Sequence, residues 1–255
     1  MITQKRIALG VIGLVLTGSA AAANFSVSPL RLDLTSRSAM LVVTHEGDTP
    51  VDLEVKAKIW TQVDGKDVYG DTSTSDLEVS PQLFTLPTPK IGKKVCLPNK
   101  CNIKVSVVNE GIRSGTEKAY RLYVTELPPP HHEAGESVVI RTSFGIPVFV
   151  SDPNAKVSAK LRVSVEGGGG GFIKVRLVNQ GTAHAHLKSI TSDPAGITSG
   201  EMDEWYVLPG ASHLYSLPIS GSVCGQSQAL LSIHLDQGKP IAVPVSIPGG
   251  ACKSG

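Results

Sequence analysis

Four cysteines are the most reactive side chains in this sequence of 255 residues, and they fall into two local groups. Cys96 and Cys101 flank Leu97-Pro98-Asn99-Lys100, which is typical of a hairpin turn, whereas Cys224 and Cys252 lie near the end of the chain. The spacing between Cys96 and Cys101 is too wide for the usual zinc knuckle. Three pairings are possible, and we favour 96–101 with 224–252 because each bond then stays within one domain. We therefore expect two disulfides and no metal site.

The other reactive side chains do not form a known catalytic arrangement. His184 and His186 would share one face of a strand, but no carboxylate ligands lie beside them in the sequence. There is no Gly-x-Ser-x-Gly elbow and no His-Glu-x-x-His motif. The glycines of 167–171 lack the Lys-Ser/Thr of a phosphate loop and sit between two expected strands, which is typical of a hairpin tip. We expect neither catalysis nor a bound cofactor.

The composition indicates a folded globular protein. Hydrophobic residues make up 41% of the chain and charged residues 18%, which excludes a disordered tail or a collagen-like fibre. The net charge of +2 gives no concentrated basic field, so we expect no nucleic-acid partner.

Residues 1–23 have the pattern of an export signal. Lys5 and Arg6 precede an apolar run from Ile7 to Leu16, and Ala21-Ala22-Ala23 offers a cleavage site for signal peptidase. The run is much shorter than the roughly 20 residues that cross a bilayer, so we expect no membrane insertion. The mature chain is predicted to begin near Asn24, in an exported compartment that permits disulfides.

Apolar and polar residues alternate in many short stretches after residue 24, as in strands with one buried face. Turn-forming residues such as Asp64-Gly65 separate these stretches. Many short strands at this spacing predict an all-β sandwich or barrel. The alternating stretches are Leu53–Ile59, Ile103–Val107, Tyr120–Val124, Leu161–Val165, Ile173–Leu177 and Leu231–Leu235.

A domain boundary is predicted at Ser151-Asp152-Pro153-Asn154, where a long apolar run ends in turn formers. About 100 residues or slightly more lie on each side, which is the size of one immunoglobulin-like sandwich. We therefore expect a first domain at 24–152 and a second at 153–255. A short echo of Val108-Asn109-Glu110-Gly111 in Val178-Asn179-Gln180-Gly181 suggests a duplication.

The apolar run from Val138 to Val150 is unusually long for a strand of a solitary sandwich. Pro147 lacks an N–H and is tolerated only at an edge, a bulge or a strand end. A long apolar edge invites aggregation unless something covers it, so another polypeptide could complete it. Alternatively, the run is a core strand that continues into the second domain. The alternation alone leaves both readings open.

Several segments, in this order, resemble a periplasmic pilus-assembly chaperone of the PapD-like chaperone–usher family, and the end of the long run resembles the archaic branch of that family. The segments are Pro29–Leu32, Val79–Leu86, Tyr120–Tyr123 with Glu126–Pro128, and Val138–Val150 with its end Phe144–Val150. The resemblance implies two immunoglobulin-like domains in an L or boomerang arrangement. It also implies a periplasmic chaperone whose partners are pilus subunits, which are incomplete immunoglobulin-like folds that lack one strand. The chaperone lends its long strand to each subunit and delivers it to the outer-membrane usher, without nucleotide.

The resemblance also implies site residues. The donated side chains would share one face of the long strand, and we assign them to Val138, Ile140, Thr142, Phe144 and Ile146. The family binds the terminal carboxylate of the subunit with two basic residues, and Arg31 matches the first of them. Pro147 stands where the better-known branch has a lysine as the second. We take Arg141 as its replacement, with Arg121 as a further substitute.

A second interpretation keeps the exported tandem sandwich and makes it a structural protein, either a pilus subunit or an adhesin. Such a protein would need an alternating apolar extension at its mature N-terminus to donate to a neighbour. Asn24–Pro29 is too short for that purpose, because the first strand motif already begins there.

Overall fold

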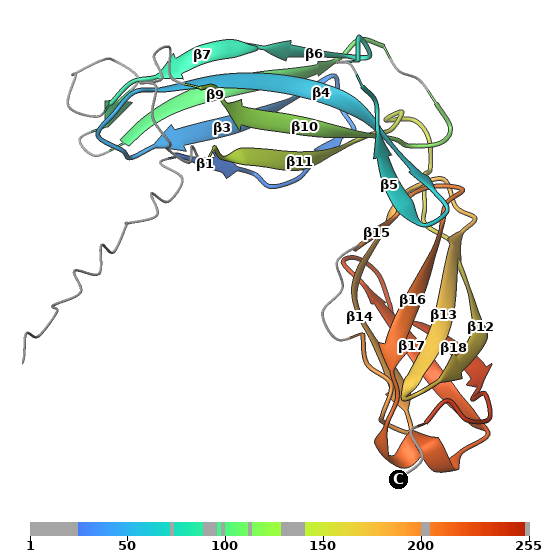
Figure 1. Cartoon of the computed structure of the whole chain (residues 1–255). Coiled ribbons are helices and arrows are strands. Elements are labelled where there is room, and N and C mark those ends of the chain that lie inside the picture. Colours follow the sequence, from blue (N-terminus) through green and yellow to red (C-terminus); the bar gives the residue numbers. More distant parts are fainter. Residues whose placement is uncertain are drawn as a thin grey trace, which may run out of the picture.

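The structure is a computed structural model that describes residues 25–71, 74–88, 96–97, 100–111, 114–128, 141–199 and 205–252. The expected export signal, residues 1–23, lies outside these residues, as do Val138 and Ile140 of the proposed donor face. The described chain consists of strands and one short 3₁₀ helix, Gly221–Gly225, and forms two β-domains set in an L (Figure 1). Within the described ranges no helix has the length and apolar character to cross a membrane.

The first domain is a sandwich of two sheets. One sheet has the order β1-β3-β9-β6, with β8 pairing β9. Its strands are β1 (Phe25–Ser28), β3 (Ser38–His45), β6 (Leu77–Ser80), β8 (Cys96–Leu97) and β9 (Lys100–Asn109). The other sheet has the order β2-β11-β10-β4-β5, with β7 pairing β4. Its strands are β2 (Leu32–Leu34), β4 (Val51–Val63), β5 (Lys66–Tyr69), β7 (Leu83–Leu86), β10 (Lys118–Glu126) and β11 (Ser143–Val150).

The alternation in β10 shows how the sequence builds this sandwich. Tyr120, Leu122 and Val124 point into the core and are almost fully buried, whereas Arg121 and Tyr123 lie on the other face of the sheet. Because side chains alternate along a strand, one apolar row from each strand is enough to fill the space between two sheets.

The second domain is also a two-sheet sandwich. One sheet has the order β12-β13-β16, and the other β15-β14-β17-β18. The strands are β12 (Leu161–Gly169), β13 (Phe172–Asn179), β14 (Ala185–Asp193), β15 (Tyr206–Val207), β16 (Ser212–Pro218), β17 (Gln228–Leu235) and β18 (Ile241–Ser246). The glycine run ends in the turn between β12 and β13, where Gly170 and Gly171 both have positive φ. The prediction of a hairpin tip there is confirmed.

The sequence echo between the two domains corresponds to a shared turn. At the end of β9, Asn109 Oδ1 accepts a hydrogen bond of 3.1 Å from Gly111 N, and at the end of β13, Asn179 Oδ1 accepts one of 3.0 Å from Gly181 N. An asparagine carbonyl that binds the backbone two residues later fixes such a turn.

Each disulfide lies within one domain. Cys96 and Cys101 join β8 to β9 across their hairpin, and Cys224 of the 3₁₀ helix joins Cys252 near the end of the chain. The two bonds therefore hold local structure and do not restrain the angle between the domains.

Residues 151–160 connect β11 to β12, and the two domains keep separate cores. Three residues of the first domain, Trp60, Ala119 and Phe149, belong to the cluster of the second domain instead of their own. The junction between the domains is thus an extension of the second core, and it lies at the end of β11.

Because the cores are separate, we expect a core truncation to act on one domain. Leu122→Ala removes a fully buried side chain from the central strand β10 and should destabilise the first domain by about 2–5 kcal/mol. Hydrogen exchange should show faster exchange in β3 and β9 while β17 keeps its protection. Leu177→Ala in β13 is the matched variant and should give the opposite pattern. If each variant lowered protection from hydrogen exchange equally in both domains, the two domains would unfold as one unit.

Candidate functional site

The outer edge of β11 is open over its first half. Along its inner side β11 pairs with β10, from Thr125↔Ser143 to Lys118↔Val150. On the outer side, β2 pairs with it in parallel, and only from Val148 to Val150. No strand in the described part of the chain covers the outer side from Ser143 to Pro147. Within the described residues, β11 is therefore an edge strand as far as Pro147 and a covered strand from Val148 onward.

The hydrogen-bond pattern identifies the backbone groups on the open side. Glu126 N donates to Thr142 O at 3.0 Å, so this pair is a hydrogen-bonded pair of the antiparallel ladder. Such pairs alternate along a ladder, which turns the backbone groups of Ser143 and Gly145 away from β10. Pro147 follows them and has no N–H to offer. The proline therefore lies where an edge strand tolerates it.

The described members of the proposed donor face become more buried along the strand. Thr142 and Phe144 are half-buried, and the Phe144 ring packs edge-on against Phe25 with centroids 5.3 Å apart. Ile146 is 1% exposed and lies in the core of the first domain. Phe144 and Ile146 thus share the face of β11 that is turned inward. Of these two, only Phe144 has appreciable surface left to bury against a partner.

Arg31 lies at the point where the open edge ends. The residue immediately before β2 is Arg31, and Leu32 pairs with Val148, so Arg31 flanks Pro147. Arg31 and Pro147 point to the outer face of the sheet, since Leu32 and Val148 point to the core.

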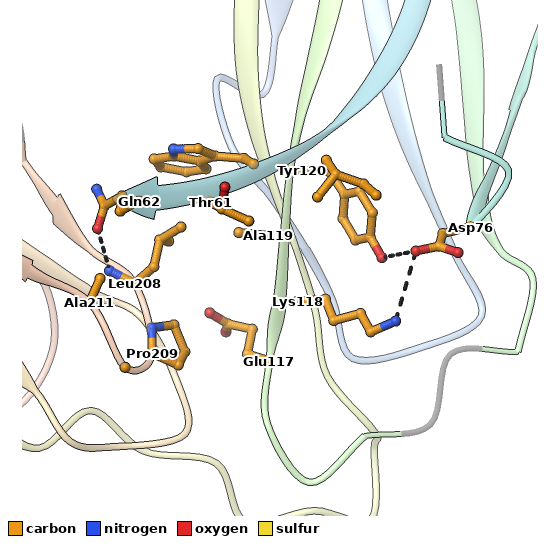
Figure 2. A pocket seen from close by; sticks show the side chains of 13 residues that line it. Thr61, Gln62, Asp76, Glu117, Lys118, Ala119, Tyr120, Leu208, Pro209 and Ala211 are labelled. Atoms are coloured by element: carbon orange, nitrogen blue, oxygen red, sulfur yellow. Dashed lines mark hydrogen bonds and ion pairs between the residues drawn. The ribbon is translucent and has the colours of Figure 1, made fainter. Parts of the chain in front are cut away.

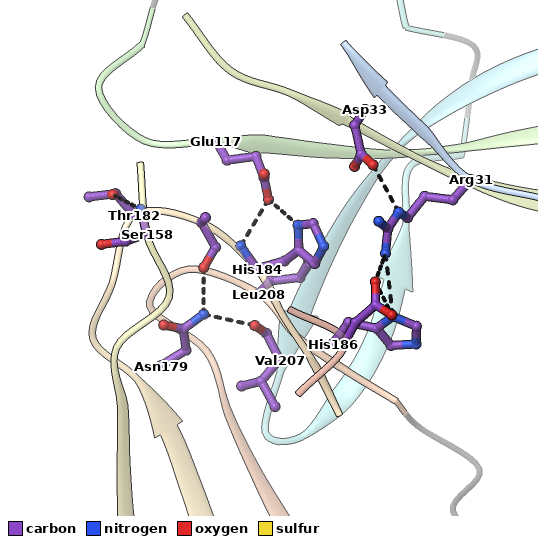
Figure 3. Close-up of polar contacts among 12 residues, drawn as sticks. Arg31, Asp33, Glu117, Ser158, Asn179, Thr182, His184, His186, Val207 and Leu208 are labelled. Carbon is purple, nitrogen blue, oxygen red and sulfur yellow. Dashed lines mark hydrogen bonds and ion pairs between the residues drawn. The ribbon is translucent and has the colours of Figure 1, made fainter. Parts of the chain in front are cut away.

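The Arg31 guanidinium bridges the two domains (Figure 3). Its Nε donates to Asp33 Oδ2 at 2.9 Å, and its Nη1 donates to Asp236 Oδ2 at 2.9 Å. Nη1 also lies 3.4 Å from His186 Nδ1. The hydrogen bond from Arg31 holds the pKa of the Asp236 carboxyl below its ordinary value, whereas partial burial lowers the pKa of His186.

Arg141 is not brought to Arg31. It is exposed and precedes Pro147 by six residues, which is roughly 20 Å along an extended strand. Arg121 is much nearer, because it pairs with Pro147 from the β10 side and points to the same outer face. Its guanidinium lies 4.2 Å from the centre of the Trp60 ring and donates to the Tyr69 hydroxyl at 3.1 Å. Arg31 and Arg121 therefore flank Pro147 on either side.

Apart from His184, the junction between the domains is built from residues that the sequence did not single out. Phe149 stacks on His184 with ring centroids 3.6 Å apart, and Trp60 meets Tyr206 edge-on at 5.5 Å. Glu117 accepts hydrogen bonds from His184 N at 2.9 Å and from its ring Nδ1 at 2.7 Å (Figure 3). In the sequence, the alternation places Phe149 on the face of β11 opposite Phe144. This was the one sequence feature indicating that Phe149 does not belong to the proposed donor face.

Two cavities flank this junction. One, of about 540 Å³, is lined by Arg31, Asp33, Phe149 and His184 among other residues of both domains. The other, of about 460 Å³, lies between Tyr120 and the Leu208–Ala211 turn, as Figure 2 shows.

In the cavity of about 460 Å³, the polar side chains already form hydrogen bonds and an ion pair with their neighbours. Tyr120 donates its hydroxyl to Asp76 at 2.8 Å, Lys118 lies 3.8 Å from the same carboxylate, and Gln62 accepts from Leu208 N at 2.9 Å (Figure 2). Burial and the bond to Asp76 raise the pKa of Tyr120, so it stays protonated. The contacts of Asp76 lie within the first domain, whereas the bond between Gln62 and Leu208 joins the two domains. The groups are not an arrangement of nucleophile and base.

No family model matches the chain, and no curated protein is similar to it in sequence. Its fold, however, is that of known pilus chaperones. The crystal structure of the CsuC–CsuE chaperone–tip adhesion subunit pre-assembly complex, from archaic chaperone–usher Csu pili of Acinetobacter baumannii, matches with a TM-score of 0.61 and 18% identity. The match covers 88% of this chain and 98% of that one.

Two further chaperone structures match the same fold. The YadV chaperone matches with a TM-score of 0.57 and 13% identity over 88% of this chain and all of that one (100%). The complex of the Salmonella enterica SafA pilin with the SafB chaperone matches with a TM-score of 0.54 and 18% identity, over 87% of this chain and 94% of that one. At these identities the matches establish the fold, which has two immunoglobulin-like domains.

His186 predicts a pH dependence of stability. Its pKa is lowered in the folded state, so unfolding takes up a proton between that lowered value and the ordinary one near 6.5. The stability that the neutral ring contributes is present above pH 6.5 and is lost as the pH falls through this window. In thermal unfolding from pH 7.5 to 5, the wild type should therefore lose more of its melting temperature than His186→Gln.

His234→Gln is the control, because this histidine lies on the outer part of β17 and contacts Thr191 instead of the junction. The melting temperature of His234→Gln should fall with pH by the same amount as that of the wild type. Identical pH profiles for wild type and His186→Gln would contradict the assignment.

Proposed function

We propose that this chain is a periplasmic chaperone for pilus subunits, which completes an unfinished immunoglobulin-like fold with the open edge of β11 and hands the subunit to the outer-membrane usher. The observation that carries the proposal is a strand edge that is open from Ser143 to Pro147 and closed by β2 from Val148 onward. An export signal and two disulfides are in keeping with the periplasm.

The open edge offers what an incomplete sheet lacks. The outward N–H groups of Ser143 and Gly145 and the C=O of Ser143 can pair with a strand of another chain, which is the main-chain part of strand addition. The Gly145 C=O accepts a hydrogen bond of 3.3 Å from Arg121 Nη1. Phe144, on the inward face, is half-exposed at the opening between β1 and β11. Burying such a side chain in a partner contributes about 1.5–3 kcal/mol before the cost of ordering the partner. Leu30, which is 67% exposed, adds apolar surface near the same edge.

The cap formed by β2 gives the edge a direction. A partner strand laid parallel to β11 on its open side runs toward β2 and ends with its C-terminus at Arg31, where a guanidinium can bind a carboxylate. A partner strand laid antiparallel brings an amino group or a continuing chain to the same cation. The geometry therefore favours a parallel partner strand with a terminal carboxylate.

The neighbours in fold supply the class of partner. The CsuC–CsuE structure is a complex with a tip adhesion subunit, and the SafB structure is a complex with a pilin. A pilus subunit that lacks a strand fits an edge of this kind.

A charged side chain on the donated face should abolish capture. Phe144→Asp places a carboxylate where a partner core must be dry, so a co-exported pilus subunit should co-purify at least about tenfold less than with the wild type. Ser143→Asp is the matched control, since it adds the same charge on the adjacent residue of the opposite face, and it should retain capture. The measurement is a pull-down from periplasm, with circular dichroism to check folding.

A second variant tests the donor edge independently, in case Phe144→Asp does not fold. Ser143→Pro removes one outward N–H and leaves the inward face intact, so it should weaken capture while the melting temperature stays close to that of the wild type. Undiminished capture by folded Phe144→Asp and Ser143→Pro proteins would refute the donor edge.

A further inference from the structure

Arg31 is already bound to two carboxylates in the free chain. Asp33 Oδ2 accepts from Nε, and Asp236 Oδ2 accepts from Nη1, each at 2.9 Å. A guanidinium binds a carboxylate bidentately through a pair of N–H groups along one edge, and only two such edges lie away from its side-chain stem. Nε, on one of these edges, donates to Asp33, and Nη1, on the other, donates to Asp236. A third carboxylate that binds either edge bidentately therefore competes for a nitrogen that already donates to a resident carboxylate.

The two resident carboxylates are not equivalent. Asp33 lies in β2, two residues after Arg31, whereas Asp236 comes from the turn after β17 in the second domain. Asp236 also has other cations at hand, because Lys188 Nζ lies 3.4 Å from its Oδ1 and His186 Nδ1 lies 3.6 Å from its Oδ2. For Asp33, Arg31 is the one ion-pair partner recorded among the described residues.

We propose that Arg31 works by carboxylate exchange: an incoming terminal carboxylate displaces Asp236 from Arg31, and Asp236 passes to Lys188. This inference rests on the proposed function, since it assumes that Arg31 receives the carboxylate of a subunit. Asp236 then acts as an internal competitor that lowers the affinity of the empty site for stray carboxylates. Lys188 lowers the cost of exchange by giving Asp236 a second partner.

The exchange breaks a polar bridge between the domains. In the free chain, Arg31–Asp236 joins β2 to the second domain on one side of the junction, and Glu117–His184 joins the domains near Phe149. Carboxylate binding removes the first bridge and leaves the second. Binding at the edge and the contact between domains are therefore coupled, and by linkage each weakens the other.

The exchange can be tested with acetate as a minimal carboxylate, in the full chain and without a subunit. Acetate replaces chloride at a constant ionic strength of about 0.15 M, where charges more than about 8 Å apart are largely screened. The readout is the NMR resonance of the Arg31 Nε–H group. In the wild type, the chemical shift of this resonance should change with acetate concentration and reach a plateau. Asp236→Asn should lower the dissociation constant at least threefold, because the competitor is gone.

Lys188→Ala separates exchange from a general effect of charge. In the wild-type background it should raise the dissociation constant, since Asp236 then holds Arg31 more firmly. In the Asp236→Asn background it should have little effect. Glu78→Gln removes an exposed carboxylate from β6, in the other sheet, and should leave the dissociation constant unchanged.

An unchanged or weaker affinity in Asp236→Asn overturns the proposal, and so does an equal effect of Lys188→Ala in both backgrounds. These outcomes are independent of subunit capture. If the acetate titration contradicts the exchange but the chain still captures a pilus subunit, only this inference is refuted. If the chain captures no pilus subunit, the proposed function is refuted and the acetate result still holds.

Discussion

Backbone groups that no strand of the described chain pairs, on the outer side of β11 before Val148, are the constraint around which the rest of the molecule is arranged. An exposed apolar edge is a template for aggregation, and soluble proteins usually shorten, charge or cover such edges. This chain keeps its exposed edge short, from Ser143 to Pro147 in the described residues, and uses β2 to cover the remainder. Pro147 removes a donor at the boundary, and Arg31 places a charge there. Each feature limits unwanted pairing without closing the edge.

The covered half of β11 serves a different purpose. Phe149, on its outer face, stacks on His184 and joins the core of the second domain, together with Trp60. The strand that is free at one end is thus anchored at the other in the contact between domains. Asp236 reaches back from the second domain to Arg31, so the cation at the end of the edge is shared by both domains. Both contacts therefore tie this end of β11 to the second domain.

Much of the fold could be predicted from local pattern. Alternation of apolar and polar residues gave the all-β class, and turn residues such as Gly170 and Gly171 gave a hairpin. The class and the hairpin depend on residues that are neighbours in the sequence, and for that reason the sequence reports them well. The length of the run and Pro147 pointed to an edge strand, but the alternation left a core strand equally possible, and the pairing with β2 decided between them.

The site was harder to predict because it depends on register between distant strands. The sequence analysis preferred Arg141 to Arg121 as the second cation, but the pairing of Arg121 with Pro147 places Arg121, not Arg141, across from Arg31. Asp236 gave no signal, since it lies in an ordinary turn and its role arises from the docking of the domains. Ile146 shared a face with Phe144 as expected, but how deeply the core reaches along β11 was not visible from alternation.

The cap formed by β2 also makes the two ends of the open edge mechanically unequal. Under the proposed function, a guest strand held at Arg31 cannot slide past β2, and tension along the strand axis then acts on all of its hydrogen bonds to β11 at the same time. A force perpendicular to the sheet that starts at Ser143 instead breaks the rungs one after another. Detachment of a guest is therefore easiest by peeling from the Ser143 end, and an invading strand that enters there meets the weakest resistance.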